Sequence, residues 1–190
     1  MVIKMKKIIL LGDSIRLIGY GTRVPGLLKD GYDVWQPSDN CRFAQYTLRG
    51  LFDWRGQLEG ADIVHWNNGL WDICDLFGDG AFTPKQVYAD TMLRIAGILK
   101  KTAKKVIFAT TTPVDPANVH DSNERIIEYN DFIVPKLKAE GVLINDLHAL
   151  VYPKLDEYIS EDLIHLSEAG IDACASQVVR SIKSAEALIG

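Results

Sequence analysis

The chain has 190 residues, the length of one ordinary domain, and its 47% hydrophobic and 24% charged residues are close to the average for globular proteins. Its 21 basic and 25 acidic side chains give a formal charge of −4, which argues against a nucleic-acid-binding surface. The three cysteines form no C-x-x-C pair, so neither a disulfide framework nor a zinc site is indicated, and a cytoplasmic protein is favoured (Cys41, Cys74 and Cys174). We expect a single domain spanning residues 1–190.

The N-terminal stretch resembles the beginning of a signal peptide, because Lys4, Lys6 and Lys7 precede the apolar run Ile8–Leu11. That run ends at Gly12, before the minimum of about seven apolar residues is reached. No later window approaches the roughly 20 apolar residues that span a bilayer. We therefore expect an unprocessed, soluble protein with no membrane partner.

Short apolar runs of strand length recur along the chain, and continuous runs of this kind are typical of strands buried on both faces. The five predicted strands are Ile8–Leu11, Tyr32–Trp35, Ile63–Trp66, Val106–Ala109 and Val142–Ile144.

Three helical patterns lie between or after these runs. The first has a buried face of Tyr88, Met92, Ile95 and Leu99, with Thr83 predicted as its cap and Pro84 as its first residue. The second spans Ser122 to Ala139. The third, capped by Ser167, has an apolar stripe at helical spacing, formed by Ile171, Cys174, Ala175, Val178, Val179 and Ile182.

Strands that alternate with helices predict an α/β fold, a three-layer α/β/α sandwich around a parallel sheet, because parallel strands need crossover connections. Ligands of such sheets bind beyond the carboxyl ends of the strands. The residues that follow each apolar run are therefore the candidates for a functional site.

Three polar segments occupy those positions: Gly12-Asp13-Ser14, Asn67-Asn68-Gly69, and the late pair Asp162 and His165. A serine hydroxyl becomes a nucleophile when a histidine takes its proton, and a carboxylate must fix the tautomer of that histidine. A separation of three residues lets Asp162 and His165 project from one side of a single turn. Ser14, His165 and Asp162 are therefore the candidate catalytic residues.

The same segments, in this order, resemble the blocks of the SGNH or GDSL-type esterases and lipases, and the resemblance covers nearly the whole chain. It implies a flavodoxin-like sandwich with five parallel strands, with Ser14 as nucleophile, His165 as general base and then acid, and Asp162 as the carboxylate that orients the imidazole. It implies no cofactor.

Two blocks depart from the usual family pattern. The third block usually reads Gly-x-Asn-Asp, whereas residues 67–72 read Asn-Asn-Gly-Leu-Trp-Asp, similar to a family branch with Asn-x-Gly-Leu-His-Asp. Asn67 is therefore the expected oxyanion donor, together with the main-chain N–H of Ser14, and Asn68 is the alternative. The second block usually offers a glycine N–H, but residues 40–43 contain no glycine, so the main-chain N–H of Arg42 is the expected substitute.

Several of these residues also have simple structural interpretations. Ser14 can merely cap a following helix, and Asp72, Asp75 and Asp79 fit a solvated loop better than a calcium or zinc site. We predict no metal. The candidate substrate contacts are Asp13, Arg16, Asn68 and Trp71; Arg16 can alternatively pair with a surface carboxylate, and packing in the core is the default for each tryptophan.

The resulting prediction is a serine esterase that acts on a small-molecule acyl ester, with an acetylated sugar as the favoured candidate. An esterase or thioesterase for another small metabolite is the alternative within enzymes. A catalytically silent module that binds a sugar or a partner protein is the alternative of a different class. The sequence leaves homo-oligomer formation open.

Overall fold

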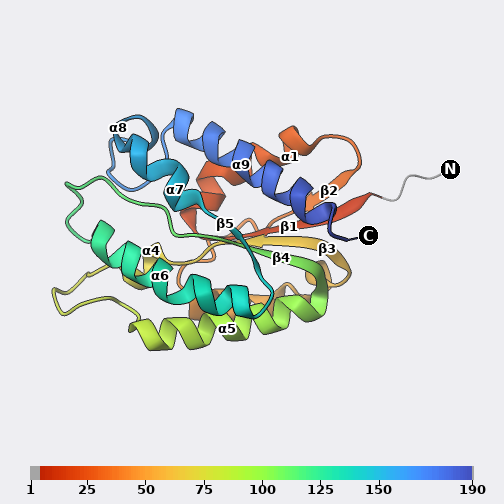
Figure 1. Cartoon of the computed structure of the whole chain (residues 1–190), viewed down its shortest axis with the longest axis horizontal. Helices are drawn as coiled ribbons and strands as arrows, with labels where there is room; N and C mark the ends of the chain where they lie inside the picture. The colour runs from red at the N-terminus through yellow and green to blue at the C-terminus, as the bar shows by residue number, and fades with distance from the viewer. Residues whose placement is uncertain (1–4, 190) are drawn as a thin grey trace.

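The computed structural model describes residues 5–189, so Lys4 of the basic N-terminal stretch lies outside the described residues. A five-stranded sheet forms the centre of the molecule, in the order β2-β1-β3-β4-β5, and all of its pairings are parallel (Figure 1). Its strands are β1 (Lys6–Leu11), β2 (Tyr32–Trp35), β3 (Ala61–Trp66), β4 (Ala103–Ala109) and β5 (Leu143–Asn145). The predicted parallel α/β architecture is confirmed.

Helices cover both faces of the sheet, which explains why its central strands are apolar throughout rather than alternating. Every residue of β3 is buried, and so is the run Ile8–Leu11 of β1. One face carries α1 (Val24–Leu28), α7 (Leu147–Val151), α8 (Leu155–Tyr158) and α9 (Glu168–Glu186). The other face carries α2 (Ala44–Asp53), α4 (Leu70–Ile73), α5 (Lys85–Thr102) and α6 (Asn123–Ala139). The remaining helical segments are η1 (Ile15–Gly19), η2 (Tyr20–Thr22), α3 (Arg55–Leu58) and η3 (Tyr152–Lys154).

The cap predicted for the last helix is present, since Ser167 accepts a hydrogen bond from the N–H of Gly170 at the start of α9. Ser122, expected as the first residue of the second helix, is its cap instead and accepts a hydrogen bond from the N–H of Arg125, so α6 begins at Asn123. The apolar stripe predicted for the last helix is buried along its length.

The predicted start of α5 is wrong. Pro84 has extended backbone angles (ψ 139°) and is itself the cap residue, so the helix begins at Lys85. The main chain of Thr83 is engaged elsewhere: its N–H donates to the carbonyl of Asp72, and its carbonyl accepts from the hydroxyl of Tyr129. Thr83 therefore anchors the preceding loop to α4 and α6 instead of capping a helix.

The loops after β3 and β4 leave the same end of the sheet, and both described termini lie at the opposite end (Figure 1). Within residues 5–189, no helix is long and apolar enough to cross a membrane.

Candidate active site

The turn after β1 presents Ser14 at the carboxyl end of the sheet. The Asp13 carboxylate accepts a hydrogen bond from the N–H of Ile15 at 3.0 Å, which closes the turn. A Cβ atom on Gly12 would lie 2.0 Å from Asn67 Oδ1, so only glycine lets the neighbouring strand approach here.

Ser14 is half-buried and is the residue before η1, a π-helical turn. Its side chain makes no capping hydrogen bond, so the simple capping interpretation of this serine does not hold. π-Helical turns are rare and occur frequently at functional sites.

Asp162 and His165 form a single hydrogen-bonded turn before α9. Asp162 Oδ2 lies 2.6 Å from His165 Nδ1, and Oδ1 accepts from the main-chain N–H groups of Ile164 and His165 at 3.0 and 2.8 Å. The hydroxyl of Ser160 also donates to Oδ1. With its carboxylate held from both sides, Asp162 fixes the His165 ring with Nδ1 facing the carboxylate and Nε2 turned away from it.

The same contacts keep Asp162 ionised. Partial burial raises its pKa, but the hydrogen bonds from the N–H and ring of His165, from Ile164 and from Ser160 outweigh burial and hold the pKa well below its usual range.

The beginning and the end of the chain pack together around this turn. Arg23, just after η2, forms ion pairs with Glu168 at 2.5 Å and Asp172 at 3.3 Å in the first turns of α9. A Cβ atom on Gly19, at the end of η1, would lie 3.5 Å from the side chain of Leu166. Burial raises the pKa of the Asp13 carboxyl, while the hydrogen bonds from Asn67 and Ile15 and the charges of Arg16 and His165 act in the opposite direction.

Asn67 belongs to a buried network under the turn that carries Ser14. Its Nδ2 donates to Asp13 Oδ1 at 2.8 Å, and its Oδ1 accepts from the hydroxyl of Tyr20 at 2.7 Å. One of the two hydrogens on Nδ2 remains for another acceptor. Tyr20 was not identified from the sequence; it lies six residues after Ser14 and faces Asn67 only because β1 and β3 are adjacent.

The segment from Cys41 to Ala44 runs beside the turn that carries Ser14, and almost every main-chain N–H and carbonyl group in it is hydrogen-bonded. Cys41 N–H donates to the carbonyl of Gly12 at 3.1 Å, and the carbonyl of Arg42 accepts from Asn68 Nδ2 at 2.8 Å. Arg42 has φ 47°, a left-handed backbone conformation that glycine usually occupies and other residues rarely adopt.

Two expectations for this segment are wrong. The Arg42 N–H donates to Asn40 Oδ1 at 2.8 Å and is therefore occupied. Asn68 is fully buried, with Nδ2 donating to the Arg42 carbonyl and Oδ1 accepting from Trp66 Nε1, so its side chain supports the segment from within. Among the main-chain N–H groups of residues 41–44, that of Phe43 has no hydrogen-bond partner in the described part of the chain. Phe43 precedes α2, and main-chain N–H groups at the start of a helix have no partner within the helix.

Arg16 is neither a substrate clamp nor a surface ion pair. Its side chain is fully buried, and its guanidinium donates to three main-chain carbonyls, those of Gly12, Pro37 and Asp39. It thereby joins the turn that carries Ser14 to the loop after β2. Asp13 is likewise buried, with Ile15 and Asn67 as partners, which corrects its expected role as a substrate contact.

Asp72 is also not part of a solvated loop. It is fully buried, its Oδ2 accepts from the N–H of Ala44 at 2.9 Å, and its Oδ1 has no hydrogen-bond partner among the described residues. Burial raises its pKa to about 7, and the nearby Asp13 carboxyl acts in the same direction. In the sequence, the only indication of Asp72 was its place as the last residue of the third block.

Trp71 remains available to a ligand, since its side chain is 40% exposed. The Arg42 guanidinium lies 4.9 Å from the centre of the Tyr46 ring and 6.0 Å from that of Trp71. An aromatic and cationic surface therefore borders the segment beside Ser14.

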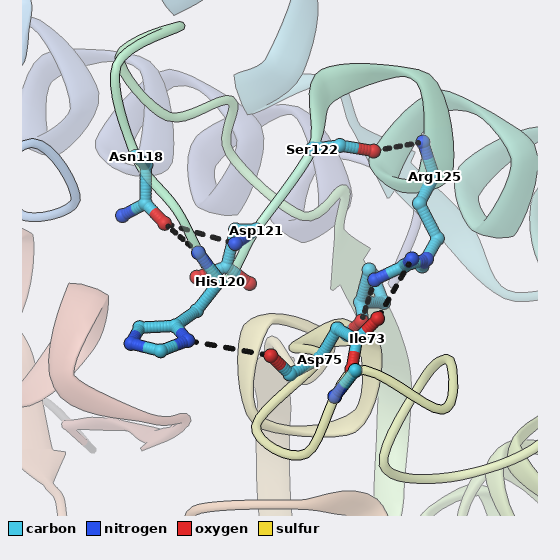
Figure 2. A network of polar contacts seen from close by, with 8 residues as sticks. Ile73, Asp75, Asn118, His120, Asp121, Ser122 and Arg125 are labelled. Atoms are coloured by element: carbon cyan, nitrogen blue, oxygen red, sulfur yellow. Dashed lines mark hydrogen bonds and ion pairs between the residues drawn. The ribbon is translucent and has the colours of Figure 1, made fainter.

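The loops after β3 and β4 are joined by polar contacts (Figure 2). Asp75 pairs with Arg125 at 3.5 Å, and its carbonyl faces His120 Nδ1 at 3.3 Å. Asn118 Oδ1 accepts from the N–H groups of His120 and Asp121, and Arg125 also donates to the Ile73 carbonyl. These contacts hold the two loops together at this end of the sheet.

Residues 5–189 contain no group of three side chains placed to hold a metal ion.

Comparison with known proteins gives a consistent picture. No family model matches the chain. The GDSL esterase/lipase CPRD49 of Arabidopsis thaliana is 26% identical over 212 residues, which is 95% of this chain and 80% of that protein.

Solved structures share the fold at low sequence identity. The lipase/acylhydrolase from Enterococcus faecalis is 23% identical, with a TM-score of 0.78 and coverage of 95% of this chain and 96% of that chain. Axe2, an acetylxylan esterase from Geobacillus stearothermophilus, is 18% identical, with a TM-score of 0.76 and coverage of 96% of both chains. With the Gly-Asp-Ser turn, the late Asp-x-x-His turn and the parallel sandwich between them, the chain is similar to the SGNH/GDSL-type hydrolases over nearly its whole length.

Proposed function

We propose that the chain is a carboxylic ester hydrolase in which Ser14, His165 and Asp162 form the catalytic triad. The observation that carries this proposal is the Asp162–His165 turn, where one carboxylate oxygen faces Nδ1 at 2.6 Å and the other binds two main-chain N–H groups. The hydroxyl of Ser14, which caps no helix, and the packing of η1 against Leu166 give further support. The esterase and acylhydrolase relatives support the same reaction class.

In the proposed reaction, Ser14 Oγ attacks the ester carbonyl while His165 Nε2 takes the hydroxyl proton. The imidazolium then gives this proton to the departing alcohol, and an acyl-enzyme remains. A water molecule that is deprotonated by Nε2 attacks the acyl carbonyl, and as the Oγ–C bond breaks the imidazolium returns the proton to Ser14 Oγ, which releases the acid and regenerates the serine hydroxyl. Asp162 keeps its charge throughout and stabilises the imidazolium.

The oxyanion of each tetrahedral intermediate needs donors beside Ser14. We assign the main-chain N–H of Ser14, the remaining hydrogen of Asn67 Nδ2, and the main-chain N–H of Phe43 in place of that of Arg42. Removing one such donor typically costs about 3–4 kcal/mol of transition-state stabilisation.

For the substrate, we propose a small acyl ester, with an O-acetylated carbohydrate as the first candidate. The exposed Trp71 ring offers a flat surface of the kind that packs on sugar rings, and one of the structural relatives is an acetylxylan esterase. An ester or thioester of another small metabolite is the alternative, and a panel of acetylated sugars against longer acyl chains separates the two.

The proposal is tested with purified protein and p-nitrophenyl acetate. We expect turnover that Ser14→Ala abolishes, together with labelling of Ser14 by a fluorophosphonate probe. Asp33→Asn, an exposed change near the beginning of β2 at the end of the sheet opposite to Ser14, is the control and keeps its activity. Absence of both turnover and labelling in the folded protein favours the silent binding module.

A further inference from the structure

The segment from Cys41 to Ala44 has an unusual pattern of hydrogen bonds. Its N–H and carbonyl groups are bound from three directions: Cys41 by the carbonyl of Gly12, Arg42 by Asn68, and Ala44 by the carboxyl of Asp72. The Phe43 carbonyl accepts the first hydrogen bonds of α2. The Phe43 N–H lies between the hydrogen-bonded carbonyl of Arg42 and the hydrogen-bonded N–H of Ala44.

Asp72 is the one ionisable side chain among these supports of Arg42–Ala44, and it is held inside the molecule. It lies in α4, and the Thr83 N–H donates to its carbonyl. The titratable side chains that act on it or feel its charge are Asp13, Cys74, Tyr88 and Tyr129, and none of them is a cation. A buried carboxyl without a cation stabilises the fold less than a well-packed apolar side chain of similar volume would. Stability alone therefore does not explain an aspartate at this position.

We propose that Asp72 is a positioning residue: its carboxyl oxygen holds the Ala44 N–H, and thereby keeps the Phe43 N–H aimed at the oxyanion. The inference rests on the proposed function, since it concerns the same site. Oxyanion stabilisation depends on donors held about 2.7–3.1 Å from the developing charge, and a displacement of about 1 Å costs on the order of 10²-fold in rate. Losing the Asp72 acceptor releases the first turn of α2 from α4 while the triad stays intact.

Two substitutions separate positioning from stability. Asp72→Asn keeps an oxygen acceptor for the Ala44 N–H without a charge, whereas Asp72→Leu fills the space and removes the acceptor. We expect Asp72→Leu to lower kcat about 10- to 100-fold with KM changed less than about threefold, and Asp72→Asn to keep kcat within about threefold of the original chain.

Asp62→Leu is the matched control. Asp62 is also buried, and its Oδ2 accepts a main-chain N–H, that of Lys7, at 2.8 Å. It differs from Asp72 in having a cation, since its Oδ1 pairs with Lys104 at 2.7 Å. It lies near the beginning of β3, at the end of the sheet opposite to the site. A general effect of removing a buried carboxyl would lower kcat in both leucine variants, whereas we expect only Asp72→Leu to lower kcat at a temperature where every variant is folded.

Hydrogen exchange measured by mass spectrometry on the peptide that covers residues 41–47 gives a readout independent of activity. We expect faster exchange in Asp72→Leu and unchanged exchange in Asp72→Asn and Asp62→Leu. Unchanged kcat and exchange in folded Asp72→Leu, or equal loss of kcat in Asp72→Asn, overturns the role of Asp72. Absence of turnover in the original chain, or turnover that survives Ser14→Ala, overturns the proposed function instead, and the exchange data then decide alone whether Asp72 holds the segment.

Discussion

Asp162 Oδ2 lies 2.6 Å from His165 Nδ1, and both residues belong to one turn whose main chain also binds the same carboxylate. The orientation of the imidazole is therefore set locally, within four consecutive residues. What the rest of the fold contributes is the position of this turn relative to Ser14.

The first prediction concerns this pair. Asp162→Asn removes the ionised acceptor and lets the ring adopt the wrong tautomer, so we expect kcat to fall about 10²- to 10⁴-fold with a small change in KM. Steady-state kinetics on p-nitrophenyl acetate provide the measurement. Activity within threefold of the original enzyme would remove Asp162 from the triad.

The second prediction addresses the proposed donor at Phe43. Its φ of −76° is compatible with proline, so Phe43→Pro removes the N–H with little change in that residue's own backbone angle. We expect kcat to fall about 10²- to 10³-fold in Phe43→Pro. Phe43→Ala keeps the N–H and serves as the control, with the loss confined to side-chain contacts such as that with the Phe82 ring at 5.6 Å. Equal losses in both variants would count against the N–H as a donor.

The third prediction follows from the pKa of Asp72, which burial raises to about 7. The folded protein holds this proton more tightly than the unfolded chain, so the contribution to stability is present at low pH and is lost as the pH rises from about 4 to about 7. Relative to Asp72→Asn, which carries no ionisable group, the original protein should lose roughly 2–4 kcal/mol of unfolding free energy across this range. Urea titrations of both proteins at pH 5 and pH 8 measure this difference, and parallel changes in the two proteins would contradict it.

The fourth prediction separates structural support from substrate binding at Arg16. Arg16→Lys cannot reach three main-chain carbonyls with one ammonium group, so we expect a fall in unfolding free energy of about 2–4 kcal/mol. Where the variant is folded, the ratio of KM values for neutral and anionic esters should stay unchanged. A selective increase of KM for anionic esters would restore the role as a substrate clamp.

Much of the fold could be predicted from the sequence, because its determinants are local. Apolar runs such as Ile63–Trp66 indicate strands buried on both faces, and the stripe from Ile171 to Ile182 indicates one helix packed on the sheet. The Asp162–His165 turn is local in the same sense, so spacing alone predicts that the two side chains meet.

The sequence by itself determined the strands, the order of the polar segments and the residues of the candidate triad. Only the tertiary structure decided that the side chains of Arg16, Asn68 and Asp72 are buried and support the site. It also decided that the N–H of Arg42 is engaged by Asn40, which leaves the N–H of Phe43 as the candidate donor in this segment. The physical reason is that a polar side chain finds its partner across strands and loops far apart in the chain, as Asn67 does with Tyr20, and residue type does not reveal whether that partner is a substrate or the protein's own main chain.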